Sequence, residues 1–256
     1  MADRTSIAWT EATWNPVTGC SRISPGCDHC YAETVAHRFS GTPAYPNGFA
    51  ITPRPERLDQ PIRWRRPRLI FVNSMSDLFH AKITDSYLDQ IFAVMEQATH
   101  HTFQILTKRP GRMRAYLRAR SRHQSIPRHL WFGVSVEDQH WADVRVPALL
   151  DINTPNRFLS AEPLLGAIDL TTIPDALAGV KWVIVGGESG RGARPMVASW
   201  VDALRDQCGA AQVPFFFKQA GVVLAREWGI SGKGDDPSGW PVAYPQQTPN
   251  LMRGDV

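Results

Sequence analysis

Residues 69–77 read LIFVNSMSD, in which four apolar residues are followed at once by a polar stretch that ends in Asp77. A short unbroken apolar run is typical of a strand that is buried on both faces of a parallel sheet. Apolar residues then recur at helical spacing from Leu88 to Met95, and the preceding Thr84 can cap the first turn. This part of the chain therefore predicts one buried strand followed by one amphipathic helix.

The same order of strand, polar stretch and helix recurs along most of the chain. Further strands are predicted at the mainly apolar stretches 103–106, 130–134, 157–159, 182–185 and 213–217. Such alternation predicts an α/β fold, and 256 residues suit a partial (β/α) TIM-type barrel of about six to seven parallel strands. A doubly wound parallel sheet is the alternative. We expect the barrel to span residues 1–225, with an irregular tail over 226–256 that packs on it through Trp228 and Trp240.

A charged residue follows each of six predicted strands near its carboxyl end. These residues are Asp77, Lys108, Glu137, Glu162, Glu188 and Lys218. In a (β/α) barrel the carboxyl ends of the strands meet at one mouth, and in a doubly wound sheet they line one edge. Strand ends also meet water in any α/β protein, so a single charged end carries no weight. Six in succession, four of them carboxylates, indicate a functional mouth.

The chain shows neither a membrane-spanning nor a secretory pattern. Hydrophobic residues make up 43% and charged residues 20% of the sequence, which is typical of a globular protein. The longest apolar runs are far shorter than the roughly 18 residues that span a bilayer. Residues 1–15 contain no signal-like apolar core. We therefore expect a cytoplasmic protein that has no membrane partner.

Positive charge is concentrated in two stretches, although the formal net charge is only +4. Residues 97–136 contain no Asp or Glu, and eight Lys and Arg residues lie within 108–128. A second cluster occupies residues 63–68, which read RWRRPR. Local positive potential of this kind attracts phosphates, so both stretches are candidate contacts to nucleic acid or a nucleotide. A solvated helix face with surface arginines is the alternative interpretation.

Three of the four cysteines, Cys20, Cys27 and Cys30, lie within eleven residues in the spacing Cys-x6-Cys-x2-Cys. In a reducing compartment such a cluster more often binds metal or performs redox chemistry than forms disulfides. Thiolates select zinc or an iron–sulfur centre, and a closed zinc site usually needs four protein ligands. Three thiolates without a clear fourth ligand favour a 4Fe–4S cluster with one open iron. Zinc stays open as the alternative, with His29, His37 or Cys208 as its fourth ligand.

A family resemblance covers nearly the whole chain, from Trp9 to about Gly221. It rests on the cysteine stretch and on the motifs FVNSMSDLFH, FQILTKRP, GVSVEDQ, FLSAEPLLG, WVIVGGESG and PFFFKQ. In combination these resemble the phage- and prophage-associated three-Cys-motif proteins, which are similar to radical S-adenosylmethionine enzymes and distantly to spore photoproduct lyase. The resemblance implies a partial (β/α) barrel with a 4Fe–4S cluster on the loop after its first strand. It also implies that S-adenosylmethionine binds the open iron and yields a 5′-deoxyadenosyl radical, with a reductase or flavodoxin-type protein as electron donor.

The sequence departs from this superfamily at two places. The first cysteine gap is x6, whereas most radical enzymes of the superfamily have x3. The letters GGE at 186–188 follow about the sixth strand, whereas the methionine-binding GGE of the superfamily follows the second. By position, the resemblance therefore assigns the methionine contacts to Ser74, Ser76 and Asp77.

The remaining cofactor contacts implied by the resemblance come from other strand ends. Ser135 and Glu137 would hold the ribose hydroxyls, because hydroxyls and carboxylates are good acceptors. Glu162 and Glu188 are candidates for polar contacts to cofactor or substrate. Tyr31, beside the cluster, would shield it or stack on adenine.

Three functions follow, and they belong to different classes. The first is a radical S-adenosylmethionine enzyme that acts on nucleic acid or a nucleotide. The second is a zinc- or cluster-bearing nucleic-acid-binding module without catalysis, which would leave the six charged strand ends unexplained. The third is a radical enzyme that acts on a small metabolite or peptide. No motif selects the substrate.

Overall fold

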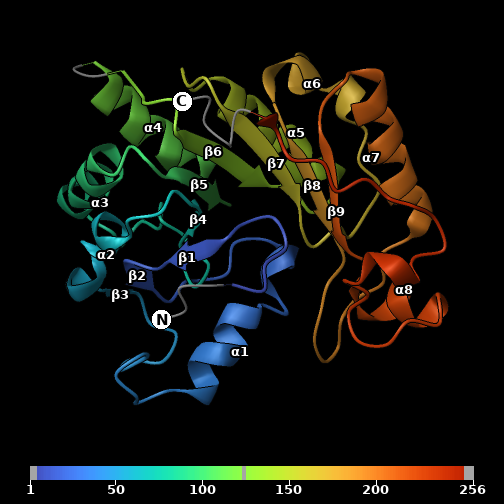
Figure 1. Ribbon diagram of the computed structural model, residues 1–256, viewed down its shortest axis with the longest axis horizontal. Coiled ribbons are helices and arrows are strands. Elements are labelled where there is room, and N and C mark those ends of the chain that lie inside the picture. Colours follow the sequence, from blue (N-terminus) through green and yellow to red (C-terminus); the bar gives the residue numbers. More distant parts are fainter. Residues whose placement is uncertain (1–4, 123–124, 251–256) are drawn as a thin grey trace. The chain divides into compact units, whose positions relative to one another are not determined.

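The computed structural model describes residues 5–122 and 125–250 of the chain. Seven strands form one sheet in the order β1-β4-β5-β6-β7-β8-β9 (Figure 1). The pairs β1–β4, β4–β5, β7–β8 and β8–β9 are all parallel. The predicted α/β fold with parallel strands is confirmed. The sheet strands are β1 (Ala12–Trp14), β4 (Leu69–Val72), β5 (Thr102–Thr107), β6 (Leu130–Ser135), β7 (Arg157–Ala161), β8 (Val183–Gly186) and β9 (Phe215–Gln219).

A helix separates each sheet strand from the next from β4 onward, so the predicted alternation of strand and helix is also confirmed. The helices are α1 (Tyr31–Arg38), α2 (Gln60–Arg63), α3 (Asp85–Gln97), α4 (Pro110–Ser121), α5 (Gln139–Leu150), α6 (Ala176–Gly179), α7 (Ala198–Ala210) and α8 (Gly221–Glu227). An additional antiparallel pair joins β2 (Val17–Thr18) to β3 (Thr52–Pro53). None of the helices in the described ranges is long and apolar enough to cross a membrane.

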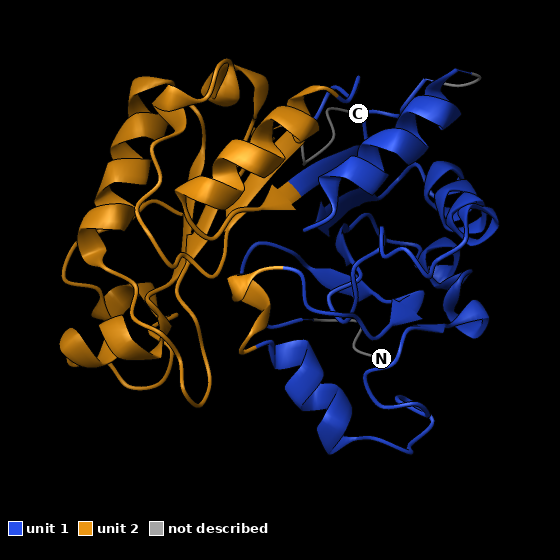
Figure 2. Cartoon of the chain, turned by 180° about the vertical axis from the view of Figure 1, so that it is seen from behind, with its two compact units in different colours: residues 1–23, 30–133, 152–156 blue, residues 24–29, 134–151, 157–256 orange. Residues whose placement is uncertain are grey.

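The chain divides into two compact units (Figure 2). Unit 1 contains residues 1–23, 30–133 and 152–156, and unit 2 contains residues 24–29, 134–151 and 157–256. The cysteine segment, residues 20–30, is divided between the two units. Cys20 and Cys30 belong to unit 1 and Cys27 belongs to unit 2.

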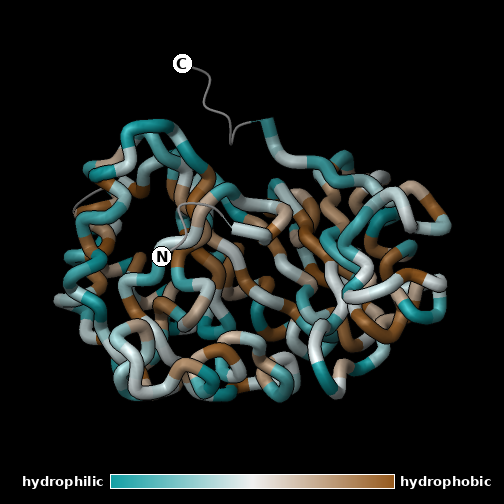
Figure 3. The backbone as a smooth tube through the Cα atoms, turned by 60° about the horizontal axis from the view of Figure 1, so that its bottom comes forward, coloured by the Kyte–Doolittle hydropathy of each residue, from teal (hydrophilic) through white to brown (hydrophobic). Residues whose placement is uncertain are grey.

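The core of unit 1 forms where strand β4 and helix α3 bury their apolar residues. Helix α3 begins as predicted, with the Thr84 hydroxyl accepting a hydrogen bond from the Tyr87 backbone N–H. Its buried residues, Leu88, Ile91, Phe92 and Met95, are those that the helical spacing picks out. The Phe92 ring lies 5.1 Å from the ring of Tyr116 on α4, which joins both helices in one core. Apolar stretches alternate with hydrophilic ones along the tube in Figure 3.

The core of unit 2 is built on β8 and β9. All four residues of β8 are buried, as are Phe215, Phe216 and Phe217 of β9. The segment after α8 packs on β9, because the Phe217 ring lies 4.7 Å from Trp240 and 4.6 Å from Tyr244. The Phe217 backbone N–H also donates to the Pro245 carbonyl. Residues 251–256 of the expected tail lie outside the described residues.

Candidate metal centre

The three clustered cysteines are free thiols with partly exposed side chains. Cys20 follows β2, and its backbone N–H donates to the Phe49 carbonyl. Cys27 ends a single 3-10 turn that begins at Pro25. Cys30 is the N-cap residue of α1. The three cysteines therefore lie shortly after β2, at the last residue of the 3-10 turn and at the start of α1.

Cys208 differs from these three in its surroundings. Its thiol is fully buried on the inner face of α7, and burial raises its pKa to about 12. A thiol in that environment behaves as a small apolar side chain. Within the residues that the structure describes, no three His, Cys, Asp or Glu side chains are grouped closely enough to hold a metal ion.

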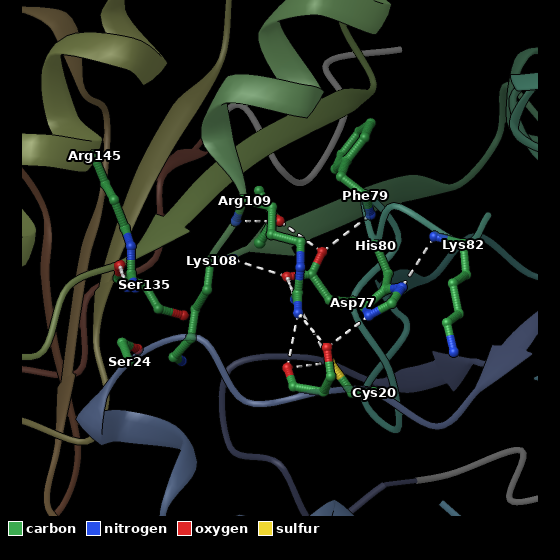
Figure 4. A network of polar contacts seen from close by, with 12 residues as sticks. Cys20, Ser24, Asp77, Phe79, His80, Lys82, Lys108, Arg109, Ser135 and Arg145 are labelled. Atoms are coloured by element: carbon green, nitrogen blue, oxygen red, sulfur yellow. Dashed lines mark hydrogen bonds and ion pairs between the residues drawn. The ribbon is translucent and has the colours of Figure 1, made fainter. Parts of the chain in front are cut away.

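In unit 1, an arginine holds the segment that carries Cys20. The Arg109 guanidinium donates through one nitrogen to Asp77 Oδ2 at 2.9 Å and to Cys20 Sγ at 3.6 Å (Figure 4). Its other terminal nitrogen donates to the Ser21 carbonyl at 2.7 Å and to Ser21 Oγ at 3.2 Å. Arg109 follows β5, so the end of this strand fixes the position of residues 20 and 21.

Asp77 anchors this arginine and uses both carboxylate oxygens to do so. Its Oδ1 accepts from the Phe79 backbone N–H and, at 2.6 Å, from the Thr107 hydroxyl. Its Oδ2 accepts from the Lys108 backbone N–H as well as from Arg109. The Asp77 side chain is only 9% exposed. The sequence assigned Asp77 to methionine contact, and in this structure its carboxylate is engaged with the end of β5.

A histidine completes the contacts of Ser21. His80 Nδ1 accepts a hydrogen bond from the Lys82 backbone N–H, so the ring proton lies on Nε2, 2.7 Å from Ser21 Oγ. Burial lowers the pKa of His80, and the nearby Arg109 charge lowers it further. The ring is therefore neutral near pH 7 and acts as a hydrogen-bond donor to the loop.

Burial raises the pKa of the Cys20 thiol, and the Asp77 carboxylate adds to this effect. The positive charge of Arg109 and its hydrogen bond to Sγ act in the opposite direction. Arg109 is thus the charged group that favours the thiolate, which is the form that binds metal.

In unit 2, the buried carboxylate of Glu137 holds the start of the 3-10 turn. The Ser24 hydroxyl donates to Glu137 Oε1 at 2.6 Å, and Arg145 donates to Oε2 at 2.8 Å. Glu137 is fully buried and Arg145 is 1% exposed. A Cβ on Gly26 would lie 2.4 Å from Glu137 Oε1, so only glycine allows the turn to pack this closely. The predicted contact of Glu137 to ribose stays a prediction.

A second arginine holds the next part of the same segment in unit 2. Arg194 donates to Glu188 Oε1 at 2.7 Å and to the Pro25 carbonyl at 2.7 Å. His29 Nδ1 lies 3.0 Å from Glu188 Oε2, which also accepts from the Arg194 backbone N–H. Burial by itself would raise the pKa of Glu188, but the hydrogen bonds from Arg194 and His29 outweigh it and hold that pKa below its usual value.

The remaining charged strand ends of unit 2 pair with each other. Lys218 Nζ, on β9, lies 2.8 Å from Glu162 Oε1, just after β7. Ser160 Oγ donates to Glu162 Oε2. A Cβ on Gly186 would lie 3.0 Å from Glu162 Oε1, so the Glu162 carboxylate lies against the end of the intervening strand β8.

The other predicted cofactor contacts lie on strand ends or beside a cysteine. The Ser74 side chain hydrogen-bonds to that of Asn15, and the Tyr31 hydroxyl donates to the Ser74 carbonyl. Ser76 Oγ is buried and makes no hydrogen bond within the described residues. Ser135 is buried, and its carbonyl accepts from Arg145. Their roles toward S-adenosylmethionine stay predictions.

The basic stretches are partly neutralised by carboxylates of unit 1. Arg112 pairs with Asp85, Arg120 with Glu96, and Arg63 with Asp59. Part of the charge at 63–68 and 108–128 is therefore used within the fold; residues 123 and 124 lie outside the described ranges. Four exposed arginines form no ion pair with any residue that the structure describes: Arg65, Arg66, Arg122 and Arg128.

Sequence reasoning missed Arg109 and Arg194 as partners of the cysteine segment. Arg109 stood out only as part of a basic stretch, and Arg194 follows a glycine-rich segment with no recognisable pattern. Both contacts join residues far apart in the chain, 89 positions for Arg109 and Cys20 and 169 for Arg194 and Pro25. No local signal could have revealed them.

In a comparison with protein families, residues 4–240 match the family described as protein of unknown function DUF5131. The chain belongs to this family. The match includes parts of both compact units and all four cysteines. No curated protein and no solved structure matches the chain.

Proposed function

We propose that this DUF5131 protein is a radical S-adenosylmethionine enzyme, in which Cys20, Cys27 and Cys30 hold a 4Fe–4S cluster. The proposal includes a partial (β/α) barrel like that of the radical enzymes, to which the parallel seven-stranded sheet is suited. The supporting observation is that carboxylates at strand ends hold the cysteine segment through serine and arginine side chains.

The donor set fits such a cluster by its chemistry. It offers three soft thiol ligands in eleven residues, none of them in a disulfide. The fourth cysteine is fully buried and is not offered as a ligand. Three protein thiolates leave one iron of a 4Fe–4S cluster free for a small-molecule ligand. The zinc alternative needs a fourth ligand, and His29, one candidate, is engaged by Glu188.

When bound and reduced, the cluster would supply the electron that cleaves S-adenosylmethionine. The role of the protein's own side chains is to hold the cysteine segment in place. Arg109 donates to Cys20, Glu137 accepts from Ser24, and Arg194 donates to Pro25. Ser76 Oγ, on the loop after β4, is buried and has no hydrogen-bond partner among the described residues. It is therefore available to hydrogen-bond to a small molecule bound at this loop.

We further propose that the substrate is nucleic acid or a nucleotide. The exposed arginines of 63–68 and 108–128 that form no ion pair among the described residues support a phosphate-bearing partner. A cytoplasmic location belongs to the proposal, because the cysteine thiols must stay reduced. A reductase or flavodoxin-type protein would deliver the electron.

The test is formation of 5′-deoxyadenosine from S-adenosylmethionine. The protein is reconstituted anaerobically with iron and sulfide, reduced with dithionite, and its products are separated by chromatography. We expect 5′-deoxyadenosine from the native chain and from Cys208→Ala, and none from Cys27→Ala. If S-adenosylmethionine binds to the reduced native protein but is not cleaved, the enzyme proposal fails and a non-catalytic binding module is favoured.

A further inference from the structure

We propose that Arg109 is the positioning residue of Cys20, whose sulfur it holds by a direct hydrogen bond so that the metal centre is bound more firmly and reduced more easily. The identity of the centre as a 4Fe–4S cluster rests on the proposed function. The hydrogen bond itself belongs to unit 1 alone and does not depend on that identity.

The geometry of the guanidinium carries this inference. Its Nη1 atom donates to both Cys20 Sγ and Asp77 Oδ2, and its Nη2 atom donates to two oxygens of Ser21. One planar group therefore contacts the ligand sulfur and the backbone of the next residue at the same time. The Arg109 side chain is only 12% exposed, so water competes little for its part-buried hydrogen bonds to Cys20 and Asp77.

Arg109 is itself fixed in place by the end of β5. Its backbone N–H donates to Thr107 Oγ1, whose hydroxyl donates to Asp77 Oδ1, and Asp77 Oδ2 accepts from the guanidinium. These hydrogen bonds form a closed ring of three residues. The orientation of Arg109 is thereby set before any metal binds, so little side-chain entropy is lost when the thiolate becomes a ligand.

Arginine is better suited to this role than lysine. The guanidinium presents five donors in a fixed plane and keeps its charge at all working pH values. A lysine ammonium is a compact charge on a flexible chain, so it can replace the charge but not the several directed hydrogen bonds. Lysine at this position should therefore restore only part of the effect.

Arg194 makes a similar contact to the cysteine segment but does not hydrogen-bond to a sulfur atom. It also pairs with a strand-end carboxylate and donates to a carbonyl of the cysteine segment. Its hydrogen bonds go to Glu188, the Pro25 carbonyl and Asp28, and none of these acceptors is a sulfur. A variant of Arg194 therefore weakens the hold on the segment without touching a ligand atom.

Two physical consequences follow for a metal centre that includes Cys20. Hydrogen bonds to the sulfur of a cluster ligand stabilise the more electron-rich, reduced state, and they raise the midpoint potential. Partners that orient a ligand also slow metal loss, and their removal typically weakens metal binding by about 10- to 100-fold.

The experiment compares four variants in the full-length, reconstituted protein: Arg109→Gln, Arg109→Lys, Arg194→Gln and Arg112→Gln. Arg112 lies on α4 and pairs with Asp85, so its variant matches the loss of one charge without contacting the cysteine segment. The readouts are the midpoint potential in an anaerobic dithionite titration and the rate at which a chelator removes the metal.

We expect Arg109→Gln to lose metal roughly tenfold faster than the native chain. We also expect its reduction equilibrium to shift about tenfold toward the oxidised state, which is about 59 mV for one electron. Arg109→Lys should lie between it and the native chain, whereas Arg194→Gln and Arg112→Gln should keep the native potential.

The inference is overturned if Arg109→Gln and Arg109→Lys both keep the native potential and rate of metal loss, or if Arg194→Gln shifts the potential as much. If Arg109→Gln does not fold, Arg109→Lys is judged against Arg112→Gln by the same criteria. A native protein that takes up zinc and no iron would refute the cluster and the effect on reduction. The firmer binding would then be judged alone, by the rate at which the chelator removes zinc from each variant.

Discussion

Replacing Gly26 by alanine should displace the turn that precedes Cys27. The added Cβ would lie 2.4 Å from Oε1 and 2.5 Å from Cγ of Glu137, whereas ordinary contacts begin near 3.4 Å. The Glu137 carboxylate is fully buried and held by Ser24 and Arg145, so it has no free direction in which to move. Forced overpacking of this kind costs about 1–3 kcal/mol of the free energy of unfolding.

Gly111→Ala is the matched control, because a Cβ at Gly111 would meet no atom within 4 Å. Gly111 lies in the first turn of α4, where alanine is neutral or stabilises by up to about 1 kcal/mol. The assay is urea unfolding of the apo protein followed by circular dichroism, with the iron content measured after reconstitution. A Gly26→Ala protein that unfolds within about 0.5 kcal/mol of the native chain and binds the full amount of iron would refute the close packing of Glu137 on the turn.

Two further predictions concern charge. The pKa of Glu188 is lower in the folded protein than its ordinary value of 4.5. Its contribution to stability is therefore fully present above about pH 4.5 and is lost as the pH falls through the pKa of the folded state. Glu188→Gln should therefore show a weaker fall in stability below about pH 4.5, measured by urea unfolding at a series of pH values, and an unchanged profile would count against the Arg194 and His29 contacts. If Arg65 and Arg66 contact phosphates, the variant with both replaced by Gln should lower the slope of log affinity against log salt by about 1.4 to 1.8, measured by fluorescence anisotropy. Arg205→Gln, in which the native arginine already pairs with Asp202 and Asp206, serves as the control, and equal slopes for all three proteins would contradict the nucleic-acid contact.

Most strands and helices could be predicted from the sequence because the longer strands of the seven-stranded sheet are buried over most of their length. Runs such as Val183–Gly186 are apolar at every position, and this pattern has few alternatives when a helix follows. Strand β1 has only three residues and β2 only two, so neither has enough residues to form a recognisable pattern. Predicting the strands also located the residues that follow them. Asp77, Glu137 and Glu188 were identified as site candidates for this reason.

The partners of those carboxylates could not be predicted. The family resemblance implied cofactor contacts for Asp77, Glu137 and Glu188, and the structure gives each of them an arginine partner. Arg109 lies 32 positions after Asp77 and meets it because β4 and β5 lie side by side. Arg145 and Arg194 lie only 8 and 6 positions after Glu137 and Glu188, but no pattern in the sequence shows which nearby side chain turns toward each carboxylate. The three cysteines could be singled out from the sequence because a spacing such as that of Cys27 and Cys30 is a local property; their role as metal ligands stays a prediction.

The most direct test of the central claim is the metal content of the anaerobically reconstituted protein, with iron, acid-labile sulfide and zinc counted per chain. Native protein and Cys208→Ala should each hold about four irons, and Cys20→Ala, Cys27→Ala and Cys30→Ala should lose the intact cluster. Stoichiometric zinc without iron in the native protein, or four irons retained in Cys27→Ala, would contradict a cluster held by the three thiolates.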